Sequence, residues 1–175
     1  MNVAPRPEVA GRGDLETALA ESDLIEIRAW LRLLTCTNLI ERRIRRNLRT
    51  SFDITLPRFD LLAQLHRAPA GLTMGALSRR LMVSNGNVTG LIERLVDEGL
   101  VERRATPADR RTQLVRLTAA GNQTLVDMLP AHHHWVAEMF AGLDRDEMTT
   151  LLDLLGRLKQ SLADGGDEPT DRDRT

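Results

Sequence analysis

Apolar side chains recur three and four positions apart along most of the chain, which is the spacing of one face of an α-helix. This pattern predicts a long first helix over residues 23–50, with Trp30 beside the early part of its apolar stripe. It predicts a second helix that starts at Thr55, because Pro57 then falls in the first turn, where its missing N–H costs nothing. The chain therefore opens with two helices.

The region after Thr118 follows the same helical pattern. Thr118 is a good N-cap for a helix that runs towards Phe140, and Pro130 inside it predicts a kink or a break. Asp144 and Glu147 have the spacing of a capping box, so they mark the start of a last, leucine-rich helix. Two further helices are thus expected before the polar C-terminal segment.

Residues 73–118 have a different organisation. Thr73 and Ser84 are each placed to cap a short helix, and a tight turn separates the two. The second helix has one apolar stripe and ends at Gly99, a residue typical of helix C-termini. The stripe consists of Val88, Leu91, Ile92 and Leu95. Two short helices joined in this way predict a helix-turn-helix, whose second helix can enter the DNA major groove.

Two short strands are expected next, over residues 100–105 and 113–118, with a proline-containing basic loop at 106–112 between them. This hairpin resembles, through Asp109-Arg-Arg111 and Val115-Arg-Leu117-Thr118, the wing of MarR-type (multiple-antibiotic-resistance regulator) transcription factors. Ser84–Gly90, continued by Leu91-Ile-Glu-Arg-Leu95, resembles their recognition helix. The resemblance extends over about residues 23–162 and implies a symmetric dimer whose first and last helices interlock.

The expected fold is mainly α: a winged helix-turn-helix with N- and C-terminal dimerisation helices, about six helices and a small two-stranded wing. The expected organisation is a flexible arm over 1–22, a dimerisation helix over 23–52, a DNA-binding lobe over 53–120, dimerisation helices over 121–163 and a disordered tail over 164–175. The apolar stripes of the terminal helices exceed what one small lobe can cover, so a second copy is the expected partner. A long monomeric bundle is the alternative.

Charge is distributed unevenly, although the net charge is only −1 and the pI about 6.4. Residues 73–118 hold eight Arg against five Asp or Glu, whereas residues 144–175 hold nine acidic against five basic residues. Affinity for nucleic acid would therefore depend on the basic middle of the chain.

No apolar run approaches the roughly 20 residues of a membrane span, no signal peptide is visible, and there is one cysteine, all of which predict a cytoplasmic protein.

The predicted DNA contacts lie in three places. At the start of the second helix, where base edges are usually met, they are Ser84, Asn85, Asn87, Val88 and Thr89. Phosphate contacts are predicted for Arg79, Arg80 and Arg94. The MarR resemblance implies that Arg111 enters the minor groove, that Asp109 orients it and that Arg110 is a second candidate.

The competing interpretation of these polar residues is simple capping and solvation. Gly86 and Gly90 favour the DNA interpretation, because each glycine costs a helix about 1 kcal/mol and suggests close approach of the backbone to a partner. A solvated hairpin tip is likewise the alternative for the wing.

A second cluster of arginines lies on the first helix. At about 100° per residue they share one face, opposite the apolar stripe; they are Arg42, Arg45, Arg46 and Arg49. A solvated face, salt bridges to the acidic last helix and DNA phosphates are all open alternatives. The functional alternative is an anion site for phosphates, which arginine grips through forked hydrogen bonds.

The segments Leu56-Pro-Arg-Phe59 and Met82–Thr89 resemble those of MarR members that respond to aromatic-acid CoA thioesters in lignin-monomer catabolism. This resemblance implies an aromatic acyl-CoA as effector, its phosphates on the arginines and its ring near Trp30 or Phe59.

Other candidate chemistry is less well supported. Three adjacent histidines at His132–His134 point about 100° apart on a helix, so they cannot all ligate one metal ion. Cys36 has a structural interpretation as a small buried group and a functional one as a redox sensor. No catalytic constellation or phosphate loop is present, so we expect no enzyme activity, no cofactor and no metal.

The sequence therefore predicts a DNA-binding transcriptional regulator, a repressor released by a small aromatic ligand, that controls catabolic or efflux genes. The expected partners are a pseudo-palindromic DNA operator, a second copy of the chain and the small-molecule effector, with no membrane. The alternative is a ligand-independent architectural or partner-binding winged-helix protein.

Overall fold

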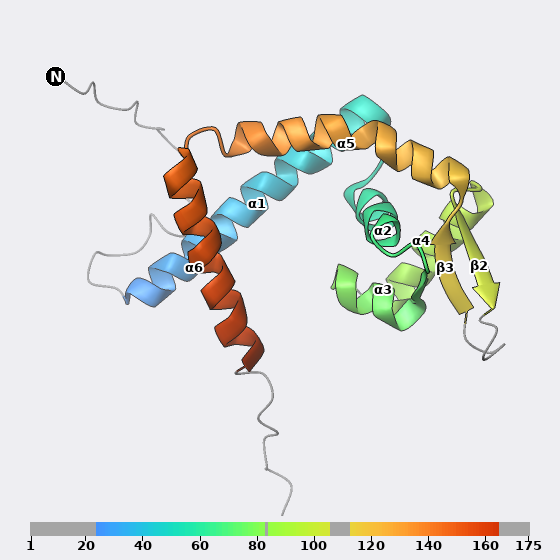
Figure 1. Cartoon of the computed structure of the whole chain (residues 1–175), viewed down its shortest axis with the longest axis horizontal. Helices are drawn as coiled ribbons and strands as arrows, with labels where there is room; N and C mark the ends of the chain where they lie inside the picture. The colour runs from blue at the N-terminus through green and yellow to red at the C-terminus, as the bar shows by residue number, and fades with distance from the viewer. Residues whose placement is uncertain (1–23, 83, 106–112, 165–175) are drawn as a thin grey trace, which may run out of the picture. The chain divides into compact units, whose positions relative to one another are not determined.

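A computed structural model of the chain describes residues 24–82, 84–105 and 113–164 (Figure 1). Six helices and a small antiparallel sheet confirm the predicted winged helix-turn-helix class. In chain order the elements are α1 (Ile25–Phe52), α2 (Leu56–His66), β1 (Leu72–Thr73), α3 (Met74–Leu81), α4 (Asn85–Asp97), β2 (Val101–Ala105), β3 (Gln113–Leu117), α5 (Ala119–Met139) and α6 (Arg145–Asp164).

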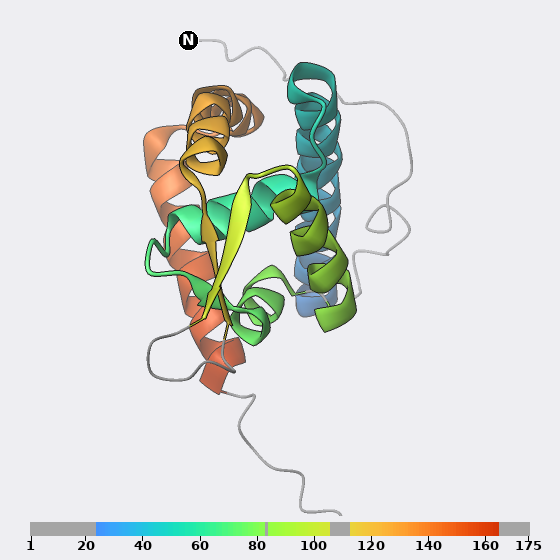
Figure 2. The same cartoon turned by 90° about the vertical axis from the view of Figure 1, so that its right-hand side faces the viewer.

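The sheet has three strands instead of the two expected for the wing. Its order is β1-β3-β2 and both pairings are antiparallel, with Leu72 opposite Val115 and Val101 opposite Leu117. The third strand, β1, is only two residues long, too short for an alternating pattern to reveal it, and it exists because β3 offers it a free edge. Figure 2 shows the β2–β3 hairpin lying across α2, which contacts β3.

The hydrophobic core lies where α2, α3, α4 and α5 meet the sheet. These helices and the end of α1 contribute apolar side chains, although Leu91 of the predicted α4 stripe is only half-buried. Strands β2 and β3 contribute one inward-facing valine each. The side chains with the least exposure are Leu48, Leu61, Leu62, Leu65, Leu77, Val88, Ile92, Leu95, Val101, Val115, Leu125 and Met128. This core fixes α3, α4 and the wing to one another.

Capping residues set the starts of the last two helices as predicted. The Thr118 hydroxyl accepts a hydrogen bond from the Gly121 backbone N–H at 3.0 Å at the start of α5. At the start of α6, the Asp144 carboxylate accepts from the Glu147 N–H at 2.8 Å and the Glu147 carboxylate accepts from the Asp144 N–H at 2.9 Å. This reciprocal pair is a capping box.

A kink or a break was predicted at Pro130, and there is no break, because α5 continues through this residue. Proline deprives the carbonyl four residues earlier of its helical hydrogen bond, and here that carbonyl belongs to Val126. Pro130 and Val126 are both exposed, so water can satisfy that carbonyl and the helix need not end.

Gly121 marks a close approach between α5 and the end of α4. A Cβ at this position would lie 1.9 Å from the Leu100 carbonyl oxygen, whose backbone also accepts a hydrogen bond from the Thr118 N–H at 3.1 Å. Only glycine allows α5 to start this close to the DNA-binding lobe.

The described residues divide into two compact units, one ending at His132 and the other starting at His133. In the first unit, the N-cap residue Leu24 and the N-terminal half of α1, with Ile25 and Trp30, are exposed at 67%, 73% and 61%. In the second unit, α6 buries no residue and exposes Leu152 and Leu162 at 64% and 70%. Of the predicted α1 stripe, a single chain therefore buries only Ile44 and Leu48.

Among the described residues, no helix combines the length and apolar character that crossing a bilayer requires.

Candidate nucleic-acid interface

The turn between α3 and α4 is fixed by a cap on each helix. The Thr73 hydroxyl accepts a hydrogen bond from the Ala76 N–H at 3.2 Å at the start of α3, and the Ser84 hydroxyl accepts from the Asn87 N–H at 3.4 Å at the start of α4. Met82 ends α3 in the left-handed conformation with φ 53°. Both caps confirm the sequence prediction, and together they leave the N-terminus of α4 at the surface.

α4 has one buried and one exposed face. Val88, Ile92 and Leu95 are 0% exposed and hold the helix in the core, whereas Gly86, Asn87 and Arg94 are exposed. The exposed residues near Ser84 also lie at the positive end of the helix dipole, which attracts phosphate oxygens. Gly86 and Asn87 are thus exposed at the end of α4 that favours an anionic partner.

Val88 is a correction to the predicted DNA contacts. Because it is 0% exposed, its side chain faces the core and cannot reach a base. Val88 lies early in the recognition helix, which predicted a DNA contact, and also in the apolar stripe, which predicted burial. Packing in the core determines the outcome, and the side chain is buried.

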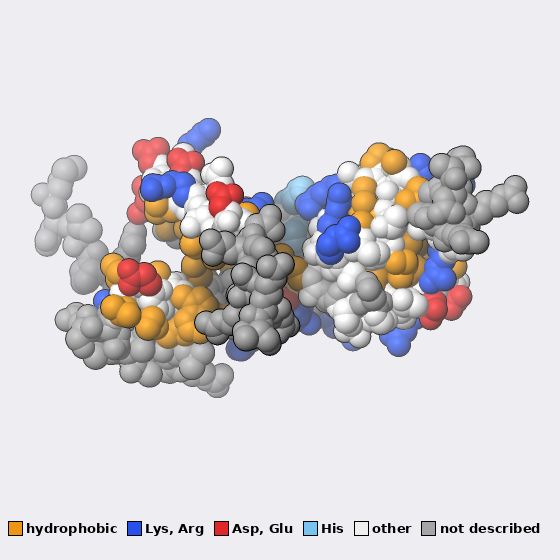
Figure 3. Space-filling model, turned by 90° about the horizontal axis from the view of Figure 1, so that it is seen from below, with side chains coloured by type: hydrophobic (Ala, Val, Ile, Leu, Met, Phe, Trp, Pro, Cys, Tyr) orange, Lys and Arg blue, Asp and Glu red, His pale blue; other side chains and the backbone are white. Residues whose placement is uncertain are grey.

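Basic side chains surround the exposed face of α4. Arg79 and Arg80 are exposed in the last turn of α3, and Arg94 is exposed in the last turn of α4. Figure 3 shows a compact group of Lys and Arg side chains on the lobe as seen from below, with hydrophobic and other side chains beside it. The arrangement suits phosphate contacts on both sides of a helix lying in a groove.

The predicted wing residues Asp109, Arg110 and Arg111 lie outside the described residues. The strands that carry the wing are described and add two arginines that the sequence analysis did not single out. Arg104 pairs with Glu102 at 2.7 Å on the same strand, and Arg103 lies 3.9 Å from Glu93 of α4. The alternation of β2 could have identified Arg103, since it pairs with Val115 across the hairpin.

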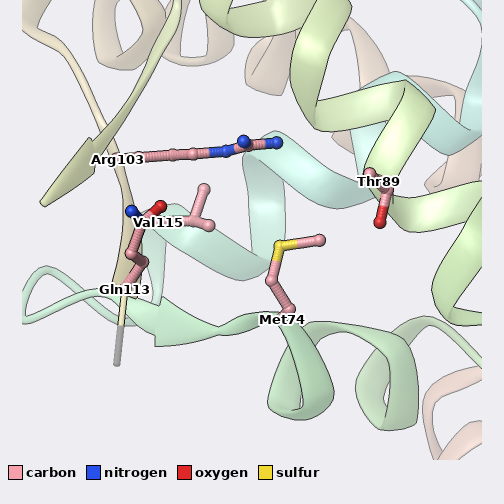
Figure 4. Close-up of a pocket in the computed structure, with 5 residues that line it drawn as sticks. All are labelled: Met74, Thr89, Arg103, Gln113 and Val115. Carbon is pink, nitrogen blue, oxygen red and sulfur yellow. The ribbon is translucent and has the colours of Figure 1, made fainter. Parts of the chain in front are cut away.

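A hollow of about 190 Å³ is lined by residues of α3, α4 and the wing strands. Figure 4 shows Arg103 reaching from β2 towards α4, with Thr89 on that helix and Met74 below. Gln113 and Val115 line the strand side. Thr89 is half-buried and lines this hollow, so of the predicted base readers it is more enclosed than Asn87.

The arginines predicted to bind a ligand are all exposed along α1. Arg45 pairs with Glu41 at 2.5 Å and Arg49 with Asp53 at 3.3 Å, both one turn apart. Among the described residues, no ion pair engages Arg42 or Arg46. Half of the predicted anion site is therefore already neutralised locally.

The two aromatic candidates differ in their surroundings. Phe59 is 3% exposed and stacks on His132 with ring centroids 4.7 Å apart, whereas Trp30 is 61% exposed. Trp30 precedes Glu41 by 11 residues, or roughly 16 Å along α1. Neither pocket found among the described residues is lined by either ring.

The pKa of Asp60 clearly departs from its ordinary value. Burial raises the pKa of this α2 carboxyl, the neighbouring Glu41 raises it further, and Arg45 opposes both. Ionisation of Asp60 is thus disfavoured at the place where α1 and α2 meet.

The remaining candidates gain no support. Among the described residues, no group of three His, Cys, Asp or Glu side chains could hold a metal ion. His134 lies 3.5 Å from Glu138, one turn away on α5. Cys36 is exposed, which differs from the buried structural role considered for it.

Comparison with known proteins matches residues 52–112 to a model described as MarR family. The chain is 28% identical over 109 residues to the HTH-type transcriptional regulator YdgJ of Bacillus subtilis, covering 62% of this chain and 66% of that one. It is 37% identical over 79 residues to the regulator YkoM of the same organism, covering 45% and 51%. The chain thus spans between half and two thirds of these relatives' length.

Among solved structures, a mutant MarR from E. coli complexed with operator DNA is 32% identical, with a TM-score of 0.66. The match covers 78% of this chain and 99% of that one.

Proposed function

The chain belongs to the MarR family of transcriptional regulators, and on that premise we propose that it is a cytoplasmic repressor that binds a pseudo-palindromic operator as a homodimer and is released by a small aromatic ligand. DNA binding and transcriptional regulation are properties of the family as a whole. The homodimer, the repressor role, the location and the ligand are the further steps of this proposal.

The observation that carries the DNA-binding role is the surface of α4. Its N-terminus is capped by Ser84, it presents Asn87 outward, and its opposite face is locked into the core by Ile92 and Leu95. An asparagine can form two hydrogen bonds with adenine N6 and N7 in the major groove. The helix is thus held firmly by one face and offers the other to base edges.

The proposed homodimer rests on apolar surface that a single chain leaves exposed. α1 exposes Leu24, Ile25 and Trp30, and α6 exposes five leucines. The leucines of α6 are Leu152, Leu154, Leu155, Leu158 and Leu162. Such stripes are far more apolar than a solvated helix face, and a second copy of the same helices is the symmetric way to bury them. A two-fold dimer then presents two copies of α4 to two half-sites about 10 bp apart.

The proposed ligand is an aromatic acid or an aromatic acyl-CoA. Arg42 and Arg46 supply forked donors for phosphate groups, and Phe59 or Trp30 supplies an aromatic surface for the ring. Binding where α1 and α2 meet would favour dimers whose lobes no longer span two half-sites, because a ligand shifts an equilibrium only by binding one state more tightly.

The test measures release of the protein from DNA by fluorescence anisotropy. The labelled duplex is the best site that the wild type selects from a random library, and the competitors are benzoyl-CoA, benzoate and CoA alone. Benzoyl-CoA should release the DNA, and the variant Arg42→Gln with Arg46→Gln should need about tenfold more of it, since two charged contacts are lost.

Each other outcome has a distinct meaning. Release by benzoate alone would remove the phosphate site and leave a ligand-responsive regulator. Release by none of the three compounds would favour the ligand-independent architectural protein. Failure of the wild type to select any sequence would contradict the regulator itself.

A further inference from the structure

One ion pair joins the start of α2 to the end of the recognition helix α4. The guanidinium of Arg58, the third residue of α2, contacts the carboxylate of Glu98, the C-cap of α4. The two residues are 40 positions apart in the sequence, and their side chains are only 26% and 41% exposed. The contact therefore depends on the tertiary fold and lies partly away from solvent.

Neither charge suits its own helix. An arginine in the first turn of α2 lies at the positive end of the helix dipole, and a glutamate at the C-cap of α4 lies at the negative end. Each placement costs a few tenths of a kcal/mol up to about 1 kcal/mol. Residues that oppose local preference on both helices indicate that the long-range pair itself is needed.

Most other ion pairs among the described residues are local, and Arg103–Glu93, which joins β2 to α4, is longer at 3.9 Å and more exposed at 35% and 59%. Arg45–Glu41 and Arg49–Asp53 lie one turn apart on the same helix, with at least 42% of every side chain exposed. Exposed pairs of that kind contribute little. Arg58, in contrast, has a buried Nε with no hydrogen-bond partner among the described residues, so loss of Glu98 would remove the ion-pair partner of a partly desolvated charge.

Because of the location of Glu98, the ion pair can influence the position of the residues predicted to contact base edges. α4 has 13 residues and is about 20 Å long, and Glu98 lies at the end opposite Ser84 and Asn87. A tilt of about 3° at the Glu98 end moves the other end by about 1 Å, more than the roughly 0.5 Å tolerance of a preorganised site. Apolar contacts through Ile92 hold the buried face of α4, and the ion pair adds a directional constraint at the Glu98 end.

We propose that Arg58 is a positioning residue for base recognition: through Glu98 it sets the tilt of α4 and thereby the discrimination between operator and other DNA. This inference rests on the proposed DNA-binding function. Arg58 touches no base itself. It acts on sequence discrimination and leaves the phosphate contacts that dominate non-specific binding unchanged.

The test uses the full-length protein and two duplexes: the best site that the wild type selects from a random 30-bp library, and a scrambled duplex of equal composition. Arg58→Gln and Glu98→Gln should each lower the ratio of the two affinities about fivefold to tenfold, with the affinity for the scrambled duplex within about twofold of wild type. Glu138→Gln is the matched control, since it removes one exposed carboxylate from an ion pair within α5, and it should leave the ratio unchanged.

The exchanged pair, Arg58→Glu with Glu98→Arg, separates positioning from general weakening of the fold. Both charges then suit their helix dipoles, so the melting temperature should equal or exceed that of wild type, and the affinity ratio should return to within about twofold of wild type. Circular dichroism confirms that each variant is folded, and Glu98→Gln serves as the milder variant.

Equal affinity ratios in wild type, Arg58→Gln and Glu98→Gln would overturn the proposal. So would a folded exchanged pair that fails to recover the ratio. If the wild type selects no sequence, the DNA-binding function itself fails, which is distinguishable because no reference ratio then exists.

Discussion

Replacing both Gly86 and Gly90 of α4 with alanine should stabilise the free protein and weaken its binding to DNA. A Cβ at either position would meet no heavy atom within 4 Å, and neither glycine has a positive φ. Each substitution removes the helix penalty of glycine, about 1 kcal/mol, so the double variant should gain about 2 kcal/mol. For a chain of this size, that raises the melting temperature by about 4–8 °C.

The reason for keeping two glycines is then external to the folded chain. If DNA approaches the backbone of α4 at these positions, the added methyl groups should lower the affinity for the selected operator at least about tenfold. Thermal melting followed by circular dichroism measures the first effect, and anisotropy titration of labelled operator measures the second.

Gly156→Ala on α6 is the control, because that glycine is also helical and open within its unit. It should gain helix stability with no change in affinity for DNA. A double variant of α4 that is more stable and still binds operator as tightly as wild type would refute the reasoning, because the glycines would then have no role at the interface.

Three further predictions concern other parts of the chain. Gly121→Ala should destabilise the protein by about 1–3 kcal/mol in chemical denaturation despite the better helix former, because its Cβ would collide with the Leu100 carbonyl oxygen. Asp60→Asn should raise the melting temperature at about pH 7 and change it little below pH 3.8. Burial and Glu41 raise the pKa of Asp60 in the folded state, so its protonated carboxyl contributes its full stability below pH 3.8. This contribution is lost as the pH rises through the raised pKa of the folded state, and the uncharged asparagine avoids that loss. Arg111→Ala should flatten the dependence of log affinity on log salt by about one unit, and an unchanged slope and affinity would mean that this residue does not contact DNA.

The features that the sequence predicted correctly depend on neighbours in the chain. Thr73 and Ser84 were identifiable as caps because the N–H groups they accept from lie three residues away. Gly99 was identifiable as a helix end because glycine readily adopts the positive φ that commonly follows a helix, and its φ is 73°. The spacing of apolar residues alone predicted the buried and exposed faces of α4. The same spacing placed Val88 on the buried face, so Val88 should not have been included among the DNA contacts.

The features that escaped prediction depend on residues far apart in the chain. β1 is two residues long and becomes a strand only by pairing with β3, about 40 positions later. The Arg58–Glu98 pair opposes the local helix preferences that sequence reasoning relies on, so no local rule could have suggested it. The arginine face of α1 was predicted correctly as a face, but its pairing with Glu41 and Asp53 depends on side-chain conformation as well as on spacing.

The most direct test of the central claim is an affinity measurement for every single base-pair substitution in the selected site, with wild type and with Asn87→Ala. The account predicts a two-fold symmetric site with half-sites about 10 bp apart, in which Asn87→Ala costs about 1–3 kcal/mol on the best site and loses discrimination at one base pair of each half-site. Discrimination at the other base pairs should remain as in wild type. Wild type and variant with the same affinity for every duplex would show that the N-terminus of α4 does not read bases, and would contradict the account.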